Sequence, residues 1–169
     1  MRAEIARAVA LLRAGELVAF PTETVYGLGA DAANAAAVAK IFAAKGRPSE
    51  HPLIVHLPSA DHLARWAREL PAEAEKLAAA FWPGPLTVVA RQQSSLRWDL
   101  GETRGTVAIR MPDHEVALEV LERTGPLAVS SANTTGEPPA TDAHEAKRML
   151  GAAVAVVIER PGRAKLAIV

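Results

Sequence analysis

The sequence predicts an α/β fold in which a twisted sheet of mixed parallel and antiparallel strands is flanked by helices. Short runs rich in Val, Ile and Leu alternate along the chain with stretches of helical periodicity, and this alternation is typical of α/β domains. Two neighbouring runs, 85–90 and 106–111, are separated only by a polar, loop-like stretch. Because strands joined without a helix pair antiparallel, we expect a mixed sheet rather than a purely parallel one.

Six apolar runs predict the strands of this sheet. They are residues 17–20, 53–58, 85–90, 106–111, 126–131 and 154–159. Each run has the usual length of a strand and is rich in β-branched and other apolar side chains, which suit a buried, pleated surface.

Apolar residues at helical spacing, with start and stop signals, predict the helices. The first is amphipathic and lies within residues 1–15, and the others begin at Asn34, Ser59, Pro71, Asp113 and Asp142. Asn, Ser and Asp are good N-caps because their side chains accept a hydrogen bond from a free backbone N–H. Asp142 with Glu145 resembles a capping box, and Gly46 and Gly125 are expected to end their helices.

Length, composition and charge limit the classes to which the protein can belong. Its 169 residues suit a single domain over 1–169, and the 50% of hydrophobic residues argue against disorder. The 19 basic residues balance 19 acidic ones, whereas a dedicated nucleic-acid binder is usually basic. The absence of cysteine excludes disulfides, thiol catalysis and cysteine-ligated zinc, and is compatible with a cytoplasmic protein. No apolar run is long enough to span a membrane, and the charged N-terminal stretch does not resemble a signal peptide.

Familiar signatures of nucleotide and catalytic sites are missing. The sequence has no G-x-x-x-x-G-K-[ST] phosphate loop, no G-x-G-x-x-G fingerprint and no G-x-S-x-G nucleophile elbow. The pairs His114-Glu115 and His144-Glu145 lack the second histidine of a metalloprotease helix, and we expect both to be solvated helix starts. Any nucleotide site must have another design, and no metal-ligating cluster is predicted.

The first candidate site is the stretch FPTETVYGLGAD, residues 20–31, which follows an apolar run. Its hydroxyls and carboxylate, on Thr22, Glu23, Thr24 and Tyr26, could contact a small polar ligand, because α/β sheets usually bind ligands at strand ends. Its glycines permit close approach of the backbone. The alternative is a turn whose hydroxyls bond their own backbone, and composition alone slightly favours that alternative.

The second candidate is AAKGRPSEHPLIVH, which contains Lys45, Arg47 and His56. Lys45 and Arg47 lie close together just before a predicted strand, and two such cations suit a polyanion such as a triphosphate. Arginine can bind it through two parallel hydrogen bonds, and lysine adds a compact positive charge. The alternative for Lys45 is a favourable position in the last turn of a helix. A lone histidine in an apolar strand, such as His56, is usually a hydrogen-bonded core residue.

Two further candidates lie at the ends of later strands. LAVSSANTTGEPPA places Ser131 and Asn133 after an apolar run, where hydroxyl and amide groups can bind phosphate oxygens or an adenine edge. Asn-Thr-Thr-Gly is equally good turn chemistry. Arg110 leaves an apolar strand before Met-Pro, and its burial would be costly without an anionic partner on the protein or on a substrate.

Taken together, the segments FPTETVYGLGADA, KGRPSEHPLIVH, FWPGPLT, VAIRMPDH and SSANTTGEPP resemble the YrdC/TsaC family of threonylcarbamoyl-AMP synthases. The match runs from about Gly15 to Thr141, with the motifs in the family's order. The resemblance implies a concave, positively lined ligand cavity. It also implies a nucleotidyltransferase that converts L-threonine, bicarbonate and ATP into threonylcarbamoyl-adenylate and pyrophosphate, with Mg²⁺ arriving on the ATP. Partner proteins would then transfer the threonylcarbamoyl group to an adenosine of tRNA.

The resemblance also implies roles for particular residues. The family's K-x-R…S-x-N signature would bind ATP and its phosphates, and it falls on Lys45, Arg47, Ser131 and Asn133. Lys45 and Arg47 would also stabilise charge during the reaction. A second group would bind threonine, and it consists of Thr22, Tyr26, His56 near the threonine side chain, and Arg110 at the carboxylate.

The chain departs from the family's pattern in two places. His51 stands where family members commonly have Asn before PLIVH. At the end, Ala167 and Ile168 stand where a Ser-Thr-Val segment would offer hydroxyls, so we expect the tail from about residue 160 to be diverged or truncated. Two alternatives to the synthase remain: a non-catalytic RNA-binding module of the same fold, and a relative that handles carbamoyl-adenylate.

Overall fold

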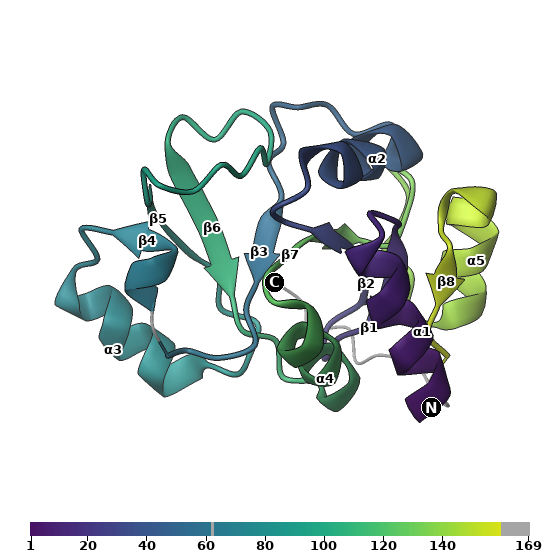
Figure 1. Cartoon of the computed structure of the whole chain (residues 1–169), viewed down its shortest axis with the longest axis horizontal. Helices are drawn as coiled ribbons and strands as arrows, with labels where there is room; N and C mark the ends of the chain where they lie inside the picture. Colours follow the sequence, from purple (N-terminus) through teal and green to yellow (C-terminus); the bar gives the residue numbers. More distant parts are fainter. Residues whose placement is uncertain (62, 160–169) are drawn as a thin grey trace.

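The computed structural model describes residues 1–61 and 63–159, and in this part of the chain eight strands form one sheet (Figure 1). The strands are β1 (Val18–Pro21), β2 (Tyr26–Asp31), β3 (Ile54–His56), β4 (Ala67–Arg68), β5 (Val88–Gln92), β6 (Thr106–Arg110), β7 (Leu127–Ser131) and β8 (Val156–Val157). Their order is β4-β5-β6-β3-β7-β2-β1-β8. The pairs β3–β6 and β1–β8 are parallel and the other neighbours are antiparallel, which confirms the predicted mixed sheet and the pairing of β5 with β6.

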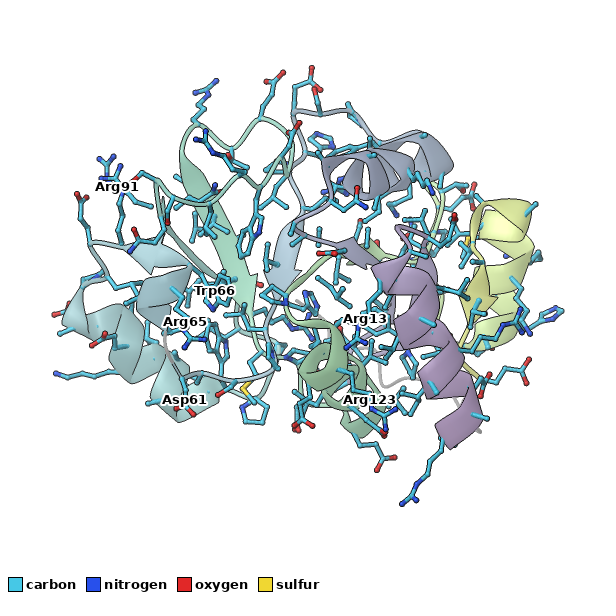
Figure 2. The ribbon with its side chains drawn as sticks, viewed as in Figure 1. Arg13, Asp61, Arg65, Trp66, Arg91 and Arg123 are labelled. Atoms are coloured by element: carbon cyan, nitrogen blue, oxygen red, sulfur yellow. The ribbon has the colours of Figure 1, made fainter. Side chains whose placement is uncertain are left out.

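Helices cover both faces of the sheet. Within the described residues they are α1 (Arg2–Arg13), α2 (Ala35–Lys45), α3 (Ala72–Phe81), α4 (Glu115–Thr124) and α5 (Ala143–Leu150). Successive side chains of a strand point to opposite faces, so Val18 and Phe20 belong to a core cluster with α1 and α4. Ala19 belongs to the core cluster of the other face, which includes buried residues of α2, α3 and α5. Helices α1 and α4 lie side by side (Figure 1), and Arg13 on α1 donates to the carbonyl oxygen of Arg123 on α4 over 2.5 Å (Figure 2).

Helices α1 and α4 cover only part of their face of the sheet, and the part near β5 is exposed. Register partners place Val89, Ala108, Ile54 and Val129 in one row across β5, β6, β3 and β7. Val129 is buried against the two helices, whereas the side chain at the other end of the row, Val89, is 66% exposed. The helices therefore leave part of this face uncovered over β3, β6 and β5.

Most of the predicted helix signals are present in the structure. Asn34 Oδ1 accepts a hydrogen bond from the Ala37 N–H over 3.1 Å, Asp142 Oδ1 accepts one from Glu145 over 2.9 Å, and Gly46 ends α2 with a φ of +62°. The prediction for α4 was wrong by one residue, because the N-cap is His114, whose Nδ1 accepts from the Val116 N–H, and not Asp113. His114 is also buried, so the expected solvated helix start is wrong for this residue.

The helix predicted to begin at Ser59 does not form. Ser59 Oγ accepts from the Asp61 N–H in a turn, residues 63–65 make one 3₁₀ turn, and β4 then pairs with β5 at the sheet edge. Trp66 stacks on Trp98 with the ring centroids 5.2 Å apart (Figure 2 labels Trp66). Helical spacing is a weak signal beside these long-range contacts, since tertiary packing routinely overrides local propensity.

Strand β2 was not predicted, because two glycines interrupt its apolar pattern. It lies inside FPTETVYGLGAD and pairs with both β1 and β7. A Cβ on Gly29 would lie 2.7 Å from a ring carbon of Phe20, so this glycine makes room for the Phe20 ring across the β1–β2 pair. The glycine pattern thus reflects packing inside the sheet as well as the candidate site.

Two sequence expectations are not tested by this structure. The departures at Ala167 and Ile168 lie outside the described residues, and a single domain over 1–169 remains a prediction. In the part that is described, no helix is both long and apolar enough to cross a membrane.

Candidate active site

A cavity of about 280 Å³ lies on the open side of the sheet, where β3, β6 and β7 meet the turn after β1. Five of the predicted site residues line it: Thr22, Arg47, His56, Arg110 and Ser131. The other lining residues are Thr24, Val25, Gly27, Ile54, Val129 and Ser130. Strand pairing explains part of this convergence, because His56 and Arg110 are register partners on adjacent parallel strands.

The turn between β1 and β2 satisfies its own hydroxyls while it borders the cavity. Thr22 Oγ1 donates to the Val25 carbonyl oxygen over 2.6 Å and lies 3.1 Å from Thr24 Oγ1. The N–H groups of Thr24 and Val25 both point to Thr22 Oγ1 at 3.3 Å. The Thr22 hydroxyl therefore bonds the backbone of its own turn, as the alternative interpretation of the sequence proposed. The same turn also places Thr22 and Thr24 in the cavity wall.

Arg110 is held at the cavity by three contacts from two segments, the turn between β1 and β2 and the loop before β5. Its Nε donates to the Gly84 carbonyl oxygen over 3.2 Å, and its Nη2 donates to Thr24 Oγ1 over 3.3 Å. The same Nη2 forms an ion pair with Glu23, the anionic partner that the sequence required but did not identify. Burial lowers the pKa of Arg110 to about 10, so the side chain still carries a positive charge near neutral pH.

Arg47 lines the cavity from the loop after α2. Its Nε donates to the His51 carbonyl oxygen over 2.6 Å, Nη2 to Pro52 over 3.0 Å, and Nη1 to Ser130 Oγ over 3.3 Å. Two backbone carbonyls of its own loop thus fix the guanidinium beside β7. His51 contributes through its backbone, so the exchange of Asn for His at this position does not remove the contact. Burial lowers the pKa of Arg47.

Lys45 lies behind the cavity wall rather than in it. The residue is 3% exposed, and its Nζ donates to the carbonyl oxygens of Ser131 and Asn133 at 2.5 Å each, with Asn133 Oδ1 at 3.4 Å. The Asn133 side chain in turn donates to the carbonyl oxygens of Thr134 and Glu137. Lys45 and Asn133 therefore shape the loop that follows β7. Burial, aided by the nearby charge of Arg47, lowers the pKa of Lys45 to about 8.

His56 is a neutral, buried imidazole at the cavity. It is 4% exposed, and burial lowers its pKa to about 4, with the backbone of Ile54 acting weakly in the opposite sense. Its Nδ1 has no hydrogen-bond partner of normal geometry among the described residues. A buried polar atom usually has a partner, so the unpaired Nδ1 makes His56 a candidate hydrogen-bonding residue of this cavity.

The structure does not bring Tyr26 to the cavity. Its side chain belongs to the core on the opposite face of the sheet, and its hydroxyl donates to the Ile158 carbonyl oxygen over 3.2 Å. Strand alternation explains the difference: Tyr26 and its neighbour Gly27 face opposite sides of β2, and Gly27 lines the cavity.

The cavity combines positive charge with a small apolar wall. Arg47 and Arg110 supply the charge, Ile54 and Val129 supply the apolar surface, and His56 and the hydroxyls supply hydrogen bonds. Such a site suits a small ligand that carries both anionic and aliphatic groups. Among the described residues, no group of three His, Cys, Asp or Glu side chains could hold a metal ion.

Sequence relatives and solved structures agree with these observations. A protein of Mycobacterium tuberculosis is 48% identical over 155 residues, which span 92% of this chain and 71% of that protein. The threonylcarbamoyl-AMP synthase of Pyrococcus abyssi is 51% identical over 138 residues, which span 81% of this chain and 41% of that protein. The structure of Pyrococcus abyssi Sua5 complexed with L-threonine has a TM-score of 0.90 and 45% identity, and covers 95% of this chain and 47% of that one. This chain thus spans less than half the length of the archaeal relative.

The family model extends across nearly the whole chain. The Sua5/YciO/YrdC model, described as telomere recombination, matches residues 10–166. The match confirms the resemblance predicted from the order of the motifs. The chain belongs to the Sua5/YciO/YrdC family.

Proposed function

We propose that this protein is an L-threonylcarbamoyladenylate synthase, a nucleotidyltransferase that converts L-threonine, bicarbonate and ATP into threonylcarbamoyl-AMP and pyrophosphate. The observation that carries the proposal is the cavity where Arg47, Arg110 and the neutral His56 converge. The chain is 45% identical to a protein whose structure was solved with L-threonine, and 51% identical to one named threonylcarbamoyl-AMP synthase.

L-Threonine fits the half of the cavity next to β3 and β6. Its carboxylate would pair with Arg110, because a guanidinium binds a carboxylate through charge-assisted hydrogen bonds. Its hydroxyl would donate to His56, which is neutral near pH 7 and whose Nδ1 has no hydrogen-bond partner among the described residues. Its methyl group would contact the apolar wall. Thr22 would border this subsite, and Tyr26 would support it from the core by fixing β2.

The phosphates of ATP would lie at the side of the cavity next to Arg47 and β7. Arg47 and Ser131 line the cavity, and their guanidinium and hydroxyl groups would contact phosphate oxygens. Lys45 and Asn133 would contribute from behind, because they hold the loop after β7 in place and the charge of Lys45 adds positive potential. With a pKa of about 8, Lys45 carries that charge at neutral pH.

The proposed reaction needs positioning and charge stabilisation more than covalent catalysis. The neutral amine of threonine attacks bicarbonate with loss of water, or CO₂ with loss of a proton, to give a carbamate, which water readily destroys. A carbamate oxygen then attacks the α-phosphorus, and pyrophosphate leaves. Arg47 and Lys45 would stabilise the negative charge that develops on the phosphates, and a site that excludes water would protect the carbamate.

Mg²⁺ would enter with ATP as part of the substrate. Among the described residues, no cluster of three acidic or histidine side chains forms a metal cage. The triphosphate oxygens and water would hold the ion instead. As part of the same proposal, the product is passed to proteins that modify tRNA, and the enzyme works in the cytoplasm, where ATP and tRNA are found.

A bicarbonate-dependence assay tests this function. The chain is incubated with ATP and L-threonine, with and without bicarbonate, and pyrophosphate and threonylcarbamoyl-AMP are measured. We expect product only when bicarbonate and threonine are both present, and we expect Arg110→Ala and Lys45→Ala to abolish it. Lys40→Ala, which removes an exposed lysine from the same helix as Lys45, is the control. No bicarbonate-dependent product, together with intact RNA binding, would favour the non-catalytic alternative.

A further inference from the structure

We propose that Glu23 is a positioning residue that holds the Arg110 guanidinium in the orientation in which it receives a substrate carboxylate. The inference rests on the proposed function for the identity of that substrate, an amino acid. It concerns a residue that lies outside the cavity lining and acts only through Arg110.

The Glu23 carboxylate has an ion-pair partner at Oε1, which makes no hydrogen bond of normal geometry, and a hydrogen-bond donor at Oε2. Oε1 forms the ion pair with Arg110 Nη2, and Oε2 accepts a hydrogen bond from the backbone N–H of Asp113, just before α4 begins. The residue belongs to the turn between β1 and β2, so the carboxylate connects this turn to the end of β6 and to the start of α4. The hydrogen bond at Oε2 restrains the carboxylate, so Oε1 stays beside the guanidinium.

The Glu23–Arg110 pair is largely buried, and an unpaired charge in such a position destabilises the fold. The side chain of Arg110 is 11% exposed and that of Glu23 is 20% exposed, whereas the side chains of the pairs Lys40–Glu16 and Arg123–Glu119 are 37–46% exposed. Removal of one partner of a buried pair leaves the other charge uncompensated. Without Glu23, the guanidinium would be expected to turn toward water or toward other acceptors.

The contacts of Arg110 indicate which part of the guanidinium is left for a ligand. Gly84 occupies Nε, and Glu23 and Thr24 share Nη2, so these three acceptors constrain one edge of the group. Arg110 lines the cavity, whereas Glu23 does not. A guanidinium held along one edge presents its remaining N–H groups in a fixed direction, and fixed donors bind a carboxylate with less loss of conformational entropy.

The binding experiment compares two ligands that differ only in the anionic group. L-Threonine and L-threoninamide are titrated by calorimetry into the unsubstituted chain, Glu23→Ala, Glu23→Gln and the control Glu119→Gln. Glu119 also pairs with an arginine, but on the exposed surface of α4. We expect Glu23→Ala to lower the preference for threonine over threoninamide about tenfold, Glu23→Gln to lower it less, and Glu119→Gln to leave it unchanged.

A second measurement needs no substrate. The Arg110 Nε–Hε signal is identified by its loss in Arg110→Lys, and its hydrogen exchange is followed by NMR in the same set of variants. We expect slow exchange in the unsubstituted chain and in Glu119→Gln, and faster exchange in Glu23→Ala.

The outcomes separate this inference from the proposed function. An unchanged preference for the carboxylate, or tighter threonine binding in Glu23→Ala, would overturn the positioning role, and so would exchange that does not depend on Glu23. A merely structural role would weaken both ligands equally and leave their ratio unchanged. Failure of the unsubstituted chain to bind L-threonine would overturn the proposed function and the carboxylate assignment, while Glu23-dependent exchange would still support the positioning of Arg110.

Discussion

The buried His56 makes a prediction about acid stability. The unfolded chain takes up a proton at this residue near its ordinary pKa of 6.5, whereas the folded chain keeps the imidazole neutral down to about pH 4. Between these values the unfolded state binds more protons, so the free energy of unfolding falls as the pH falls through this window. The His56→Gln variant lacks this titration, so its stability should depend less on pH.

The size of the effect follows from the two pKa values. The interval between 6.5 and about 4 corresponds to about 3 kcal/mol when fully expressed, and to about 2 kcal/mol between pH 7 and pH 4.5. His56 is 4% exposed, so solvent screening reduces this contribution little. An effect of this size is a large fraction of the stability of a typical domain.

Urea denaturation followed by circular dichroism at pH 7 and pH 4.5 measures the effect. We expect the unsubstituted chain to lose about 2 kcal/mol more than His56→Gln over this interval. The variant His144→Gln, which removes an exposed histidine from α5, should behave like the unsubstituted chain. Equal losses in the unsubstituted chain and in His56→Gln would refute the argument that burial keeps this imidazole neutral.

Three further predictions concern stability and are checked by urea denaturation at pH 7. Lys45→Met should lower the free energy of unfolding by about 2 kcal/mol, because it leaves the carbonyl oxygens of Ser131 and Asn133 without their donor. The control Lys40→Met, on the exposed face of α2, should change the free energy of unfolding by less than about 0.5 kcal/mol. Gly29→Ala should cost about 2 kcal/mol, because its Cβ would meet the Phe20 ring at 2.7 Å, and an unchanged midpoint would mean that the ring moves freely. Asp142→Ala should cost about 1 kcal/mol through loss of the α5 cap, and Asp142→Asn, which keeps a capping oxygen, should retain most of it.

Local rules were sufficient where the determining contacts are close in sequence. Asn34, Gly46 and Asp142 mark helix ends through hydrogen bonds or backbone angles within a few residues, and all three behave as the sequence predicts. The same rules were wrong by one residue at Asp113, because the neighbouring His114 provides the capping nitrogen. Capping depends on local geometry that two adjacent polar residues can both satisfy.

Local rules failed where distant residues compete. The residues after Ser59 have helical spacing, but β4 pairs with β5 there and Trp66 stacks on Trp98 instead. The two tryptophans lie about thirty residues apart, and the sequence gives no sign of their contact. Strand β2 was missed for a related reason. The glycines that weaken its apolar pattern are explained only by the Phe20 ring on the neighbouring strand.

The sequence by itself determined the mixed α/β class, most of the strands and the family, because alternation, capping and motif order are properties of the chain read locally. Tertiary structure decided which of the singled-out residues meet a ligand. It placed Arg47, His56 and Arg110 in one cavity, turned Tyr26 into the opposite core, and directed Lys45 to the carbonyl oxygens behind the wall. It also identified Glu23 as the partner of Arg110. Residue type indicates what a side chain can bind, but strand register and burial determine what it reaches.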